Sequence, residues 1–507
     1  MKHFFVRHGD SALPSKIMKD FFDGKVFPPC FAGKINNDEG LRLIYTERKN
    51  NYSSETRSIV HECILNQNKR LNASEKANLH AFAKGACTIT TGHQLMVCGG
   101  TAFFEVKILS AVALAKEAHR ICGRPVVPIF WMASEDHDFK EIASFRVNGQ
   151  KFTWKNKFAS GAVGRLSTQD LATQLNSFVK EARLSESQRI FINKRIQAYR
   201  ESDSLAEATR RIIREWCGDY GLLVIDGDDP KLKSLGQKIW SKELNGELSS
   251  LIQERTQEII NLGYDAQVTP RPINLFELKS RVRLRMLKPK KIQADRISPN
   301  ALIRPVYQEM LLPNIVYVGG GGELAYWLQL GKVFDALGIP MPKLYLRDSL
   351  LVCPLKIDSV LNKNKLEWID ILSETKESII KRLLEYDKLK NIETAQFAKP
   401  LKDAIEFWSQ KMDESYPEMK SHTEALKRKM DKLSSNTIEH RYRTHKRRNC
   451  DFLHRLDLIF DSVFPGEIFW ERTSSYADVL GLLGTDPRDI LVEKMSTIKA
   501  GTHILLG

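Results

Sequence analysis

The chain has 507 residues, of which 42% are hydrophobic, and this length predicts two or three folded domains rather than one core. No apolar run approaches the roughly 18 residues that a membrane helix needs, and the first residues do not resemble a secretion signal. We therefore expect a cytoplasmic protein that does not enter a membrane. The eight cysteines are scattered without a CxxC pair, which argues against a disulfide framework and against a zinc site.

The net charge of +15 is unevenly distributed along the chain. Residues 420–450 carry ten Lys or Arg and only three acidic residues. A basic segment of this kind attracts nucleic acid or anionic metabolites, although a solvated helix face is its more common meaning.

The first part of the chain predicts helices followed by one βαβ unit. Residues 1–84 are expected to be mostly helical, with interruptions at Pro28-Pro29 and Asn36-Asn37. A β-branched run at Ala86–Thr91 predicts a strand, and apolar residues recur at helical spacing from Thr101 to Ala118. A second buried strand is predicted at Val126–Met132. This order implies an α/β fold with a parallel sheet and a right-handed crossover.

Four consecutive ionisable residues follow the strand at Val126–Met132. Glu135, Asp136, His137 and Asp138 come after two small residues, at the strand end where α/β enzymes place their ligands. An exposed acidic turn is the more common fate of such residues. Three carboxylates around one imidazole nevertheless indicate a cation, a substrate amine or a proton-transfer task.

Two glycine-containing loops are candidates for binding an anion through backbone N–H groups. The first, Thr91–Gly100, joins the strand at Ala86–Thr91 to the next helix. The second, Gly319–Gly322, follows a predicted strand at Ile315–Val318 and precedes a helix carrying Tyr326, Trp327, Leu330, Val333 and Phe334 on one face. Glycine permits positive φ and a close approach of the backbone to a ligand. His93 of the first loop and His137 are expected to face each other across one pocket.

The connecting segments are predicted more coarsely. A small β insertion is expected at Phe145–Thr168, helices over 170–217 and 231–262, and strands at Gly221–Asp226 and Lys343–Leu346. Alternating Arg281, Arg283 and Arg285 predict a strand with one basic face, which either binds a phosphate or carboxylate or is merely solvated. Pro299–Pro313 predicts a stretch of turns.

Residues 358–464 differ in composition from the rest of the chain. They contain no glycine, and Met412, Met419, Leu426 and Leu433 recur every seven residues with Met430 in a companion position. This spacing predicts a coiled coil, and Pro400 and Pro417 suggest at least two long helices folded as a hairpin. The coil can pack within the chain or mediate dimerisation.

Taken together, these motifs resemble the cysteine ligases of bacillithiol biosynthesis along essentially the whole chain. The resemblance rests on TGHQ at 91–94, VPIFWMASEDHDFKEI at 127–142, RPVYQEMLLPNIVYVGGGGELAYW at 304–327 and Glu471-Arg472. The family pattern is closer to TGQQ and AGPGE where this chain has TGHQ and GGGGE.

The resemblance implies a Rossmann-like core with connecting-peptide insertions, and a C-terminal helical coiled-coil domain that supports a homodimer. We accordingly expect a core over 1–357 with insertions at about 145–200 and 265–300, a coiled-coil domain over 358–464, and a tail over 465–507 that packs on the core. The implied reaction joins cysteine to the amine of glucosaminyl-malate, and we expect ATP to activate the carboxylate. We expect no metal site built from a cluster of protein ligands.

Such a ligase must activate a carboxylate, bind anions and take a proton from the amine. We expect His137 to act as the base, oriented by Glu135 or Asp138, and Asp136 to bind the substrate ammonium or Mg²⁺. The expected substrate- or nucleotide-binding residues are Thr91, Gly92, His93, Gln94, Gly319, Gly320, Gly321, Gly322, Glu323 and Tyr326.

An RNA- or tRNA-binding protein with a synthetase-like core is the alternative. The basic segment at 420–450 favours it, but this segment has few aromatic residues for base stacking, Tyr442 being the main one. A purely structural coiled-coil dimer would not need the clustered carboxylates at the strand ends.

Overall fold

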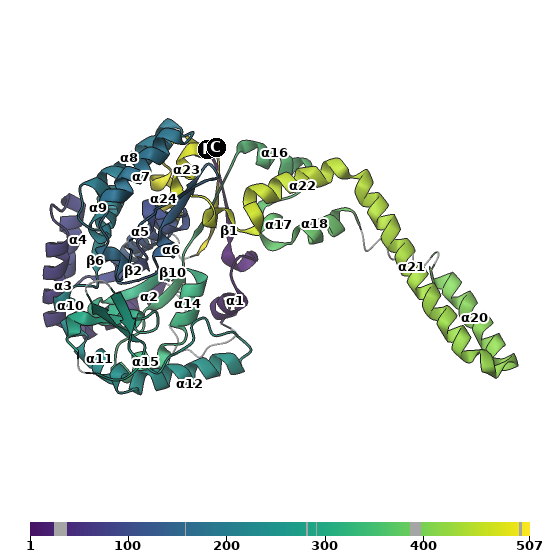
Figure 1. Cartoon of the computed structure of the whole chain (residues 1–507), viewed down its shortest axis with the longest axis horizontal. Coiled ribbons are helices and arrows are strands. Elements are labelled where there is room, and N and C mark those ends of the chain that lie inside the picture. The colour runs from purple at the N-terminus through teal and green to yellow at the C-terminus, as the bar shows by residue number, and fades with distance from the viewer. Residues whose placement is uncertain are drawn as a thin grey trace. The chain divides into compact units, whose positions relative to one another are not determined.

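The computed structural model describes residues 1–24, 38–157, 159–279, 282–290, 292–385, 396, 398–495 and 499–507. These residues form two compact units, one made of Met1–Pro354 with Ile468–Gly507 and the other of Leu355–Glu467. The first unit mixes helices and strands, whereas the second is helical (Figure 1). The predicted helical domain, 358–464, lies inside the second unit. No helix among the described residues is long and apolar enough to cross a membrane.

A five-stranded parallel sheet forms the centre of the first unit, with the strand order β11-β10-β2-β3-β6. All five strands were predicted, because short runs of β-branched and aromatic residues are typical of strands buried on both faces. Their bounds are β2 Cys87–His93, β3 Val126–Met132, β6 Leu223–Asp226, β10 Asn314–Gly319 and β11 Lys343–Leu346.

Helices cover both faces of this sheet. Helix α5 (Phe103–Cys122) makes the predicted crossover from β2 to β3 and packs with α2 (Asp38–Asn51) in one hydrophobic cluster. A larger cluster on other strand residues includes helices that come before and after β6. Their bounds are α3 Ser54–Gln67, α4 Ala73–Ala83, α10 Pro230–Leu235, α11 Gln237–Leu244 and α12 Glu247–Asn261.

The N-terminus differs from the helical prediction, because β1 (Lys2–Arg7) is a strand. It pairs antiparallel with β13 (Gly501–Leu506), which pairs parallel with β12 (Ser349–Cys353). The partner of β1 lies some 500 residues away, so local sequence pattern does not reveal it. Helix α1 (Lys16–Phe22) follows, while Pro28-Pro29 and Asn36-Asn37 lie outside the described residues.

Two predictions around the second glycine loop are wrong. Within the expected turns of Pro299–Pro313, Arg304–Leu311 forms helix α13, because Pro305 stands in its first turn, where proline is tolerated. The single helix expected after Gly322 is two helices, α14 (Gly321–Trp327) and α15 (Gly331–Leu337).

Two small sheets are formed by segments that lie between strands of the central sheet in the sequence. Strands β4 (Ser144–Val147) and β5 (Gln150–Thr153) form a hairpin, as the expected β insertion requires, and β8-β7-β9 is an antiparallel sheet. Strand β8 (Val282–Arg285) carries Arg283 and Arg285, whereas Arg281 lies outside the described residues. The remaining bounds are β7 Leu275–Lys279, β9 Ile297–Pro299, α6 Phe139–Ile142, α7 Gln169–Glu181, α8 Glu186–Arg200, α9 Leu205–Cys217, α23 Tyr476–Leu483 and α24 Arg488–Met495.

The second unit contains the predicted helical hairpin, in which α20 (Lys399–Ser415) packs against α21 (Lys420–Arg448). The seven-residue repeat does not form one continuous seam, since Met412 lies in α20 and Met419 in the turn at Pro417–Met419. The repeat therefore crosses the bend of the hairpin. The other helices are α16 Leu355–Lys363, α17 Trp368–Ser373, α18 Lys376–Leu383 and α22 Cys450–Val463.

One buried carboxyl group makes the stability of the first unit depend on pH. Glu243 in α11 is fully buried, and its Oε1 accepts hydrogen bonds from the backbone N–H and the Nδ2 of Asn274 at 2.5 and 3.0 Å. Burial raises the pKa of Glu243 from 4.5 to about 7. The folded state therefore keeps this proton longer than the unfolded state, and Glu243 makes stability fall as pH rises from about 4.5 to about 7.

We expect Glu243→Gln to raise the free energy of unfolding relative to wild type above pH 7, and this gain to vanish near pH 4.5. The amide oxygen still accepts from Asn274, but the variant no longer buries a charge at high pH. Urea unfolding at a series of pH values measures the difference. Glu493→Gln, at an exposed position, is the control and should show no such pH dependence. A constant difference across the pH range would contradict the prediction.

Candidate active site

A cavity of about 830 Å³ lies at the carboxyl ends of the central strands. The parallel pairing brings these ends together, since Thr91 of β2 lies opposite Phe130 of β3 and Val318 of β10. The structure therefore places the two glycine loops and part of the acidic cluster around one space. The predicted site residues that line it are Gly92, His93, Gln94, Glu135, Asp136, Gly320, Gly321, Gly322, Glu323 and Tyr326.

Four other predicted residues do not line this cavity. Thr91 is fully buried and its hydroxyl donates to the carbonyl of Val318 at 2.8 Å, so it ties β2 to β10. At Gly319 a Cβ would lie 2.6 Å from Cδ2 of Leu324, so glycine permits the tight turn into α14. The remaining two, His137 and Asp138, belong to the acidic cluster.

The acidic cluster is not arranged as three carboxylates around His137. Glu135 Oε1 forms an ion pair with Lys233 at 2.6 Å, and Asp138 accepts from the backbone N–H of Glu141 and so caps α6. Only Asp136 lies beside the imidazole, 3.4 Å from Nδ1. The expected orientation of His137 by Glu135 or Asp138 is therefore wrong, because nearer partners engage both carboxylates.

His137 is held by residues that the prediction did not associate with it. Its Nδ1 lies 3.1 Å from Nη1 of Arg283, and its ring packs beside Phe276, while half of the side chain (51%) remains exposed. It does not line the cavity, so His93 and His137 do not face each other across it.

His93 is half-buried against aromatic rings and stays neutral near pH 7. Its ring lies 5.3 Å from Phe103 and 5.2 Å from Phe104, and Nδ1–H donates to the carbonyl of Gln94 at 3.1 Å. Burial, helped by the charge of Lys107, lowers the pKa of His93 to about 4. Because Nδ1–H is used in this bond, the Nε2 of the neutral imidazole can accept a hydrogen bond but not donate one.

The carboxylate of Glu323 forms the centre of a buried ionic network on one wall. It pairs with Lys107, lies 3.3 Å from Nη2 of Arg304 and accepts from the hydroxyl of Tyr317. Lys107 also donates to the carbonyl of Gly92 at 2.6 Å, which joins the network to the first glycine loop. Burial opposes ionisation, yet the two cations keep the pKa of Glu323 below its usual value.

The glycines at 319–322 leave room for a ligand close to the backbone, but they do not adopt positive φ angles. None of these four glycines has positive φ, so that part of the prediction is wrong. A Cβ at Gly320 would meet no atom within 4 Å, and at Gly321 or Gly322 only ordinary contacts at 3.6 Å. Packing therefore does not require glycine at these three positions, which line the cavity.

Among the described residues, six cations line the cavity: Lys107, Arg271, Arg283, Arg304, Arg347 and Arg472. None was among the expected substrate- or nucleotide-binding residues, although Arg283 belongs to the strand predicted to have a basic face. Two of them flank the ring of Phe103, with the guanidinium of Arg347 5.2 Å and that of Arg472 5.8 Å from its centroid. Arg347 forms a buried ion pair with Glu471 at 2.7 Å. Arg347 directly follows β11, so its position at a strand end was the available sequence signal.

The predicted Mg²⁺ at Asp136 does not fit the contacts of that carboxylate. Asp136 accepts from Nε2 of Gln94 at 2.6 Å and from the backbone N–H of His137 at 2.7 Å, and Arg283 lies 3.5 Å away. No group of three or more His, Cys, Asp or Glu in the described ranges is placed to hold a metal ion. The cationic lining does fit the phosphates of a nucleotide.

Comparison with known proteins identifies the family. The protein-family model described as "Bacillithiol biosynthesis BshC, N-terminal Rossmann-like domain" matches residues 7–294 and 287–348 of this chain. A relative from Flavobacterium johnsoniae is 29% identical over 99% of both chains, and one from Christiangramia forsetii is 31% identical over 96% of both. A third, from Cytophaga hutchinsonii, is 35% identical over 64% of this chain and 67% of its own. The name assigned to each is cysteine ligase BshC. This chain therefore belongs to the BshC family of bacillithiol biosynthesis.

Proposed function

We propose that this chain joins the carboxyl group of cysteine to the amine of glucosaminyl-malate, the last step of bacillithiol biosynthesis, with ATP as the activating reagent. Forming an amide from a carboxylate in water requires activation of the carboxyl group, which ATP supplies when bound. The observation that carries the proposal is the cavity itself, which combines a cationic lining with carboxylates in a member of the BshC family.

The cations suit the anionic parts of the reactants. Malate carboxylates, the cysteine carboxylate and phosphates all bind guanidinium and ammonium groups through charged hydrogen bonds. Arg347 and Arg472 flank Phe103, while Lys107 and Arg304 lie beside Glu323. Because Gly320–Gly322 carry no side chains, an anionic group of a reactant can come close to their backbone.

The carboxylates suit the amine. Gln94 Nε2 donates to Asp136 at 2.6 Å and to Glu141 at 2.8 Å, which holds two carboxylates close together at the cavity wall. An ammonium or amine near these oxygens gains acceptors, and a carboxylate can take the proton that the nitrogen loses. The side chains of the cavity thus supply both binding modes that the reaction needs.

The test of this function is a thiol profile of source cells in which the gene is deleted. We expect bacillithiol to disappear and glucosaminyl-malate to accumulate, and purified protein with ATP, cysteine and glucosaminyl-malate to form bacillithiol. Omitting ATP from that assay tests the activation step separately. Unchanged bacillithiol in the deletion strain would contradict the proposal.

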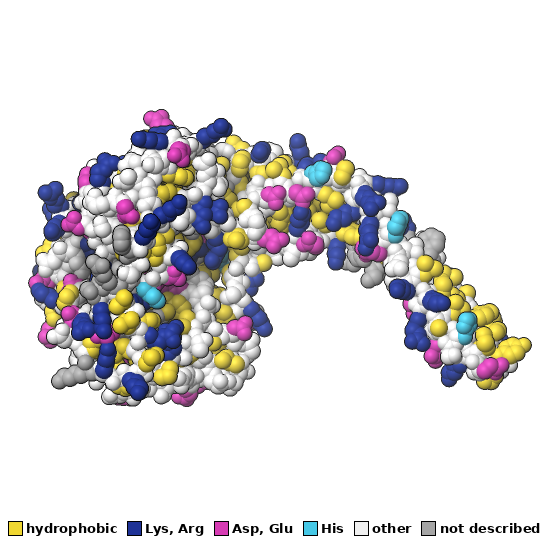
Figure 2. Space-filling model, viewed as in Figure 1, with side chains coloured by type: hydrophobic (Ala, Val, Ile, Leu, Met, Phe, Trp, Pro, Cys, Tyr) yellow, Lys and Arg dark blue, Asp and Glu magenta, His cyan; other side chains and the backbone are white. Residues whose placement is uncertain are grey.

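We also propose that the chain forms a homodimer through a coiled coil of its second unit. Hydrophobic side chains gather along the α20–α21 hairpin (Figure 2). Four of them are 43–66% exposed in the single chain: Leu401, Phe407, Trp408 and Leu433. Exposed apolar side chains on a helical hairpin are typical of a surface that a partner covers.

For the double variant Phe407→Ser with Leu433→Ser we expect the molar mass to fall from that of a dimer to that of the 58.0 kDa monomer. Serine removes the apolar surface whose burial drives association but leaves the hairpin helical. Light scattering after size-exclusion chromatography measures the mass. Arg428→Ser with Arg443→Ser, at exposed polar positions of α21, is the control. A wild-type monomer, or a variant that remains dimeric, would contradict this interface.

A further inference from the structure

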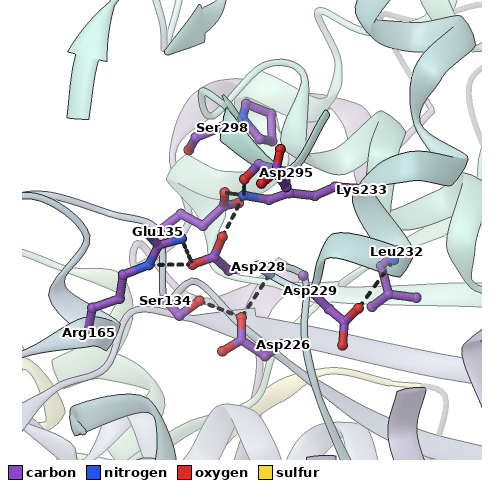
Figure 3. A network of polar contacts seen from close by, with 12 residues as sticks. Ser134, Glu135, Arg165, Asp226, Asp228, Asp229, Leu232, Lys233, Asp295 and Ser298 are labelled. Carbon is purple, nitrogen blue, oxygen red and sulfur yellow. Dashed lines mark hydrogen bonds and ion pairs between the residues drawn. The ribbon is translucent and has the colours of Figure 1, made fainter. Parts of the chain in front are cut away.

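A buried lysine contacts the acidic cluster from outside the cavity. Lys233 lies in α10, just after β6, and its side chain is 1% exposed. Its Nζ lies 2.6 Å from Oε1 of Glu135 and 2.5 Å from Oδ1 of Asp228, and it donates to the carbonyl of Asp295 at 3.2 Å (Figure 3). Hydrogen bonds to Asp228 and to the Asp295 carbonyl use two of the three N–H groups of the ammonium, and the contact with Glu135 is an ion pair.

The three partners of Lys233 are not equivalent. Asp228 already has a second cation, because Nη2 and Nε of Arg165 lie 2.7 and 3.0 Å from its Oδ2 (Figure 3). Of the three, only Glu135 also lines the cavity. Asp228 and the Asp295 carbonyl therefore fix the ammonium in place, and the ammonium fixes a carboxylate that faces the reactants.

The surroundings of Glu135 increase its affinity for a proton. Burial raises the pKa of Glu135, and the charge of Asp228 acts in the same direction, whereas Lys233 and Arg283 oppose the rise. The hydroxyl group of Tyr307 is also close enough to interact with it electrostatically. His137, by contrast, is half exposed and lies outside the cavity lining.

We propose that Glu135, rather than His137, accepts the proton from the attacking amine, and that Lys233 is the positioning residue that holds Glu135 for this step. The inference rests on the proposed function. The lone pair of the neutral amine forms the N–C bond to the activated carboxyl carbon of cysteine. The C–O bond to the leaving group breaks and its electron pair leaves with the oxygen. The proton that the nitrogen loses passes to the Glu135 carboxylate and from there to solvent.

The experiment measures bacillithiol formation by the purified full-length protein and its variants with ATP, cysteine and glucosaminyl-malate, over roughly pH 6–9. We expect Glu135→Gln to lose about 100-fold or more in rate, as for removal of a general base, and His137→Ala to lose less than about tenfold. Lys233→Arg should retain more activity than Lys233→Met. In the Glu135→Gln background, Lys233→Met should slow the reaction no further, because the residue that it positions is already inactive.

The pH profile separates positioning from a structural role. Without the ammonium, Glu135 faces Asp228, Arg283 and Tyr307, and its pKa should rise. The acid limb of the rate profile should therefore shift to higher pH in Lys233→Met, which a loss of folded protein alone would not cause. Thermal unfolding of each variant reports the folded fraction, and Lys233→Arg keeps the test informative if Lys233→Met fails to fold.

Two outcomes would overturn the inference alone: full activity of Glu135→Gln in a system where the wild type works, or an unshifted pH profile in folded Lys233 variants. A loss in His137→Ala as large as in Glu135→Gln would also overturn it, by returning the base role to the imidazole. A wild-type protein that forms no bacillithiol would overturn the proposed function, and the inference with it.

Discussion

Replacing Glu323 with Gln is expected to lower the free energy of unfolding of the first unit by about 3–5 kcal/mol and to abolish most of the activity. The carboxylate pairs with Lys107 and Arg304, and the Lys107 side chain is only 4% exposed. Gln cannot neutralise either cation, so the buried Lys107 and the partly buried Arg304 lose their partner. Because Glu323 also lines the cavity, the same change disturbs the wall that faces the reactants. Urea unfolding followed by tryptophan fluorescence, with a bacillithiol assay, measures both effects.

Glu254→Gln is the matched control for this change. Glu254 also pairs with a lysine, Lys332, but its side chain is 60% exposed, and water replaces a lost partner at low cost. We expect a change within about 0.5 kcal/mol and no loss of activity. If both variants lower the free energy of unfolding equally, burial of the Glu323 ion pairs does not account for the loss.

The second large effect is expected for Arg472→Gln. This change should reduce the affinity for an anionic substrate by about 10- to 150-fold without lowering the free energy of unfolding. Burial lowers the pKa of Arg472, and the nearby charge of Arg347 lowers it further. No ion pair within the described ranges involves the Arg472 guanidinium, so its positive charge is available to a ligand at the cavity wall. A charged hydrogen bond contributes about 1.5–3 kcal/mol, which gives this range of affinity.

For Arg472→Gln we expect KM to change while the free energy of unfolding does not fall. KM for each substrate reports the lost contact, and the free energy of unfolding should stay within about 0.5 kcal/mol or rise slightly, because two like charges are no longer held together. Arg120→Gln, at a 68% exposed position, is the control and should change neither quantity. An unchanged KM, or a parallel loss of stability, would mean that Arg472 supports the fold rather than a ligand.

The central sheet was predictable because its evidence is local. Each of the five strands is a short run of mainly apolar residues that ends at small or polar residues, and α5 has continuous helical periodicity. The Thr91–Gly100 and Gly319–Gly322 loops follow strands that are parallel, so their proximity follows from topology alone. Strand β1 could not be found in the same way, because its pairing with β13 depends on residues at the opposite end of the chain.

The sequence by itself determined that the chain has a parallel α/β sheet with glycine loops and carboxylates at its carboxyl edge, since periodicity and residue order encode those features. Only the tertiary structure decided which charged side chains meet there. Glu135 forms an ion pair with Lys233, 98 positions later in the chain. Arg472 and Arg347 both lie beside the ring of Phe103. These contacts link residues far apart in sequence, and no local pattern specifies them, because ion pairing depends on distance in space and on burial.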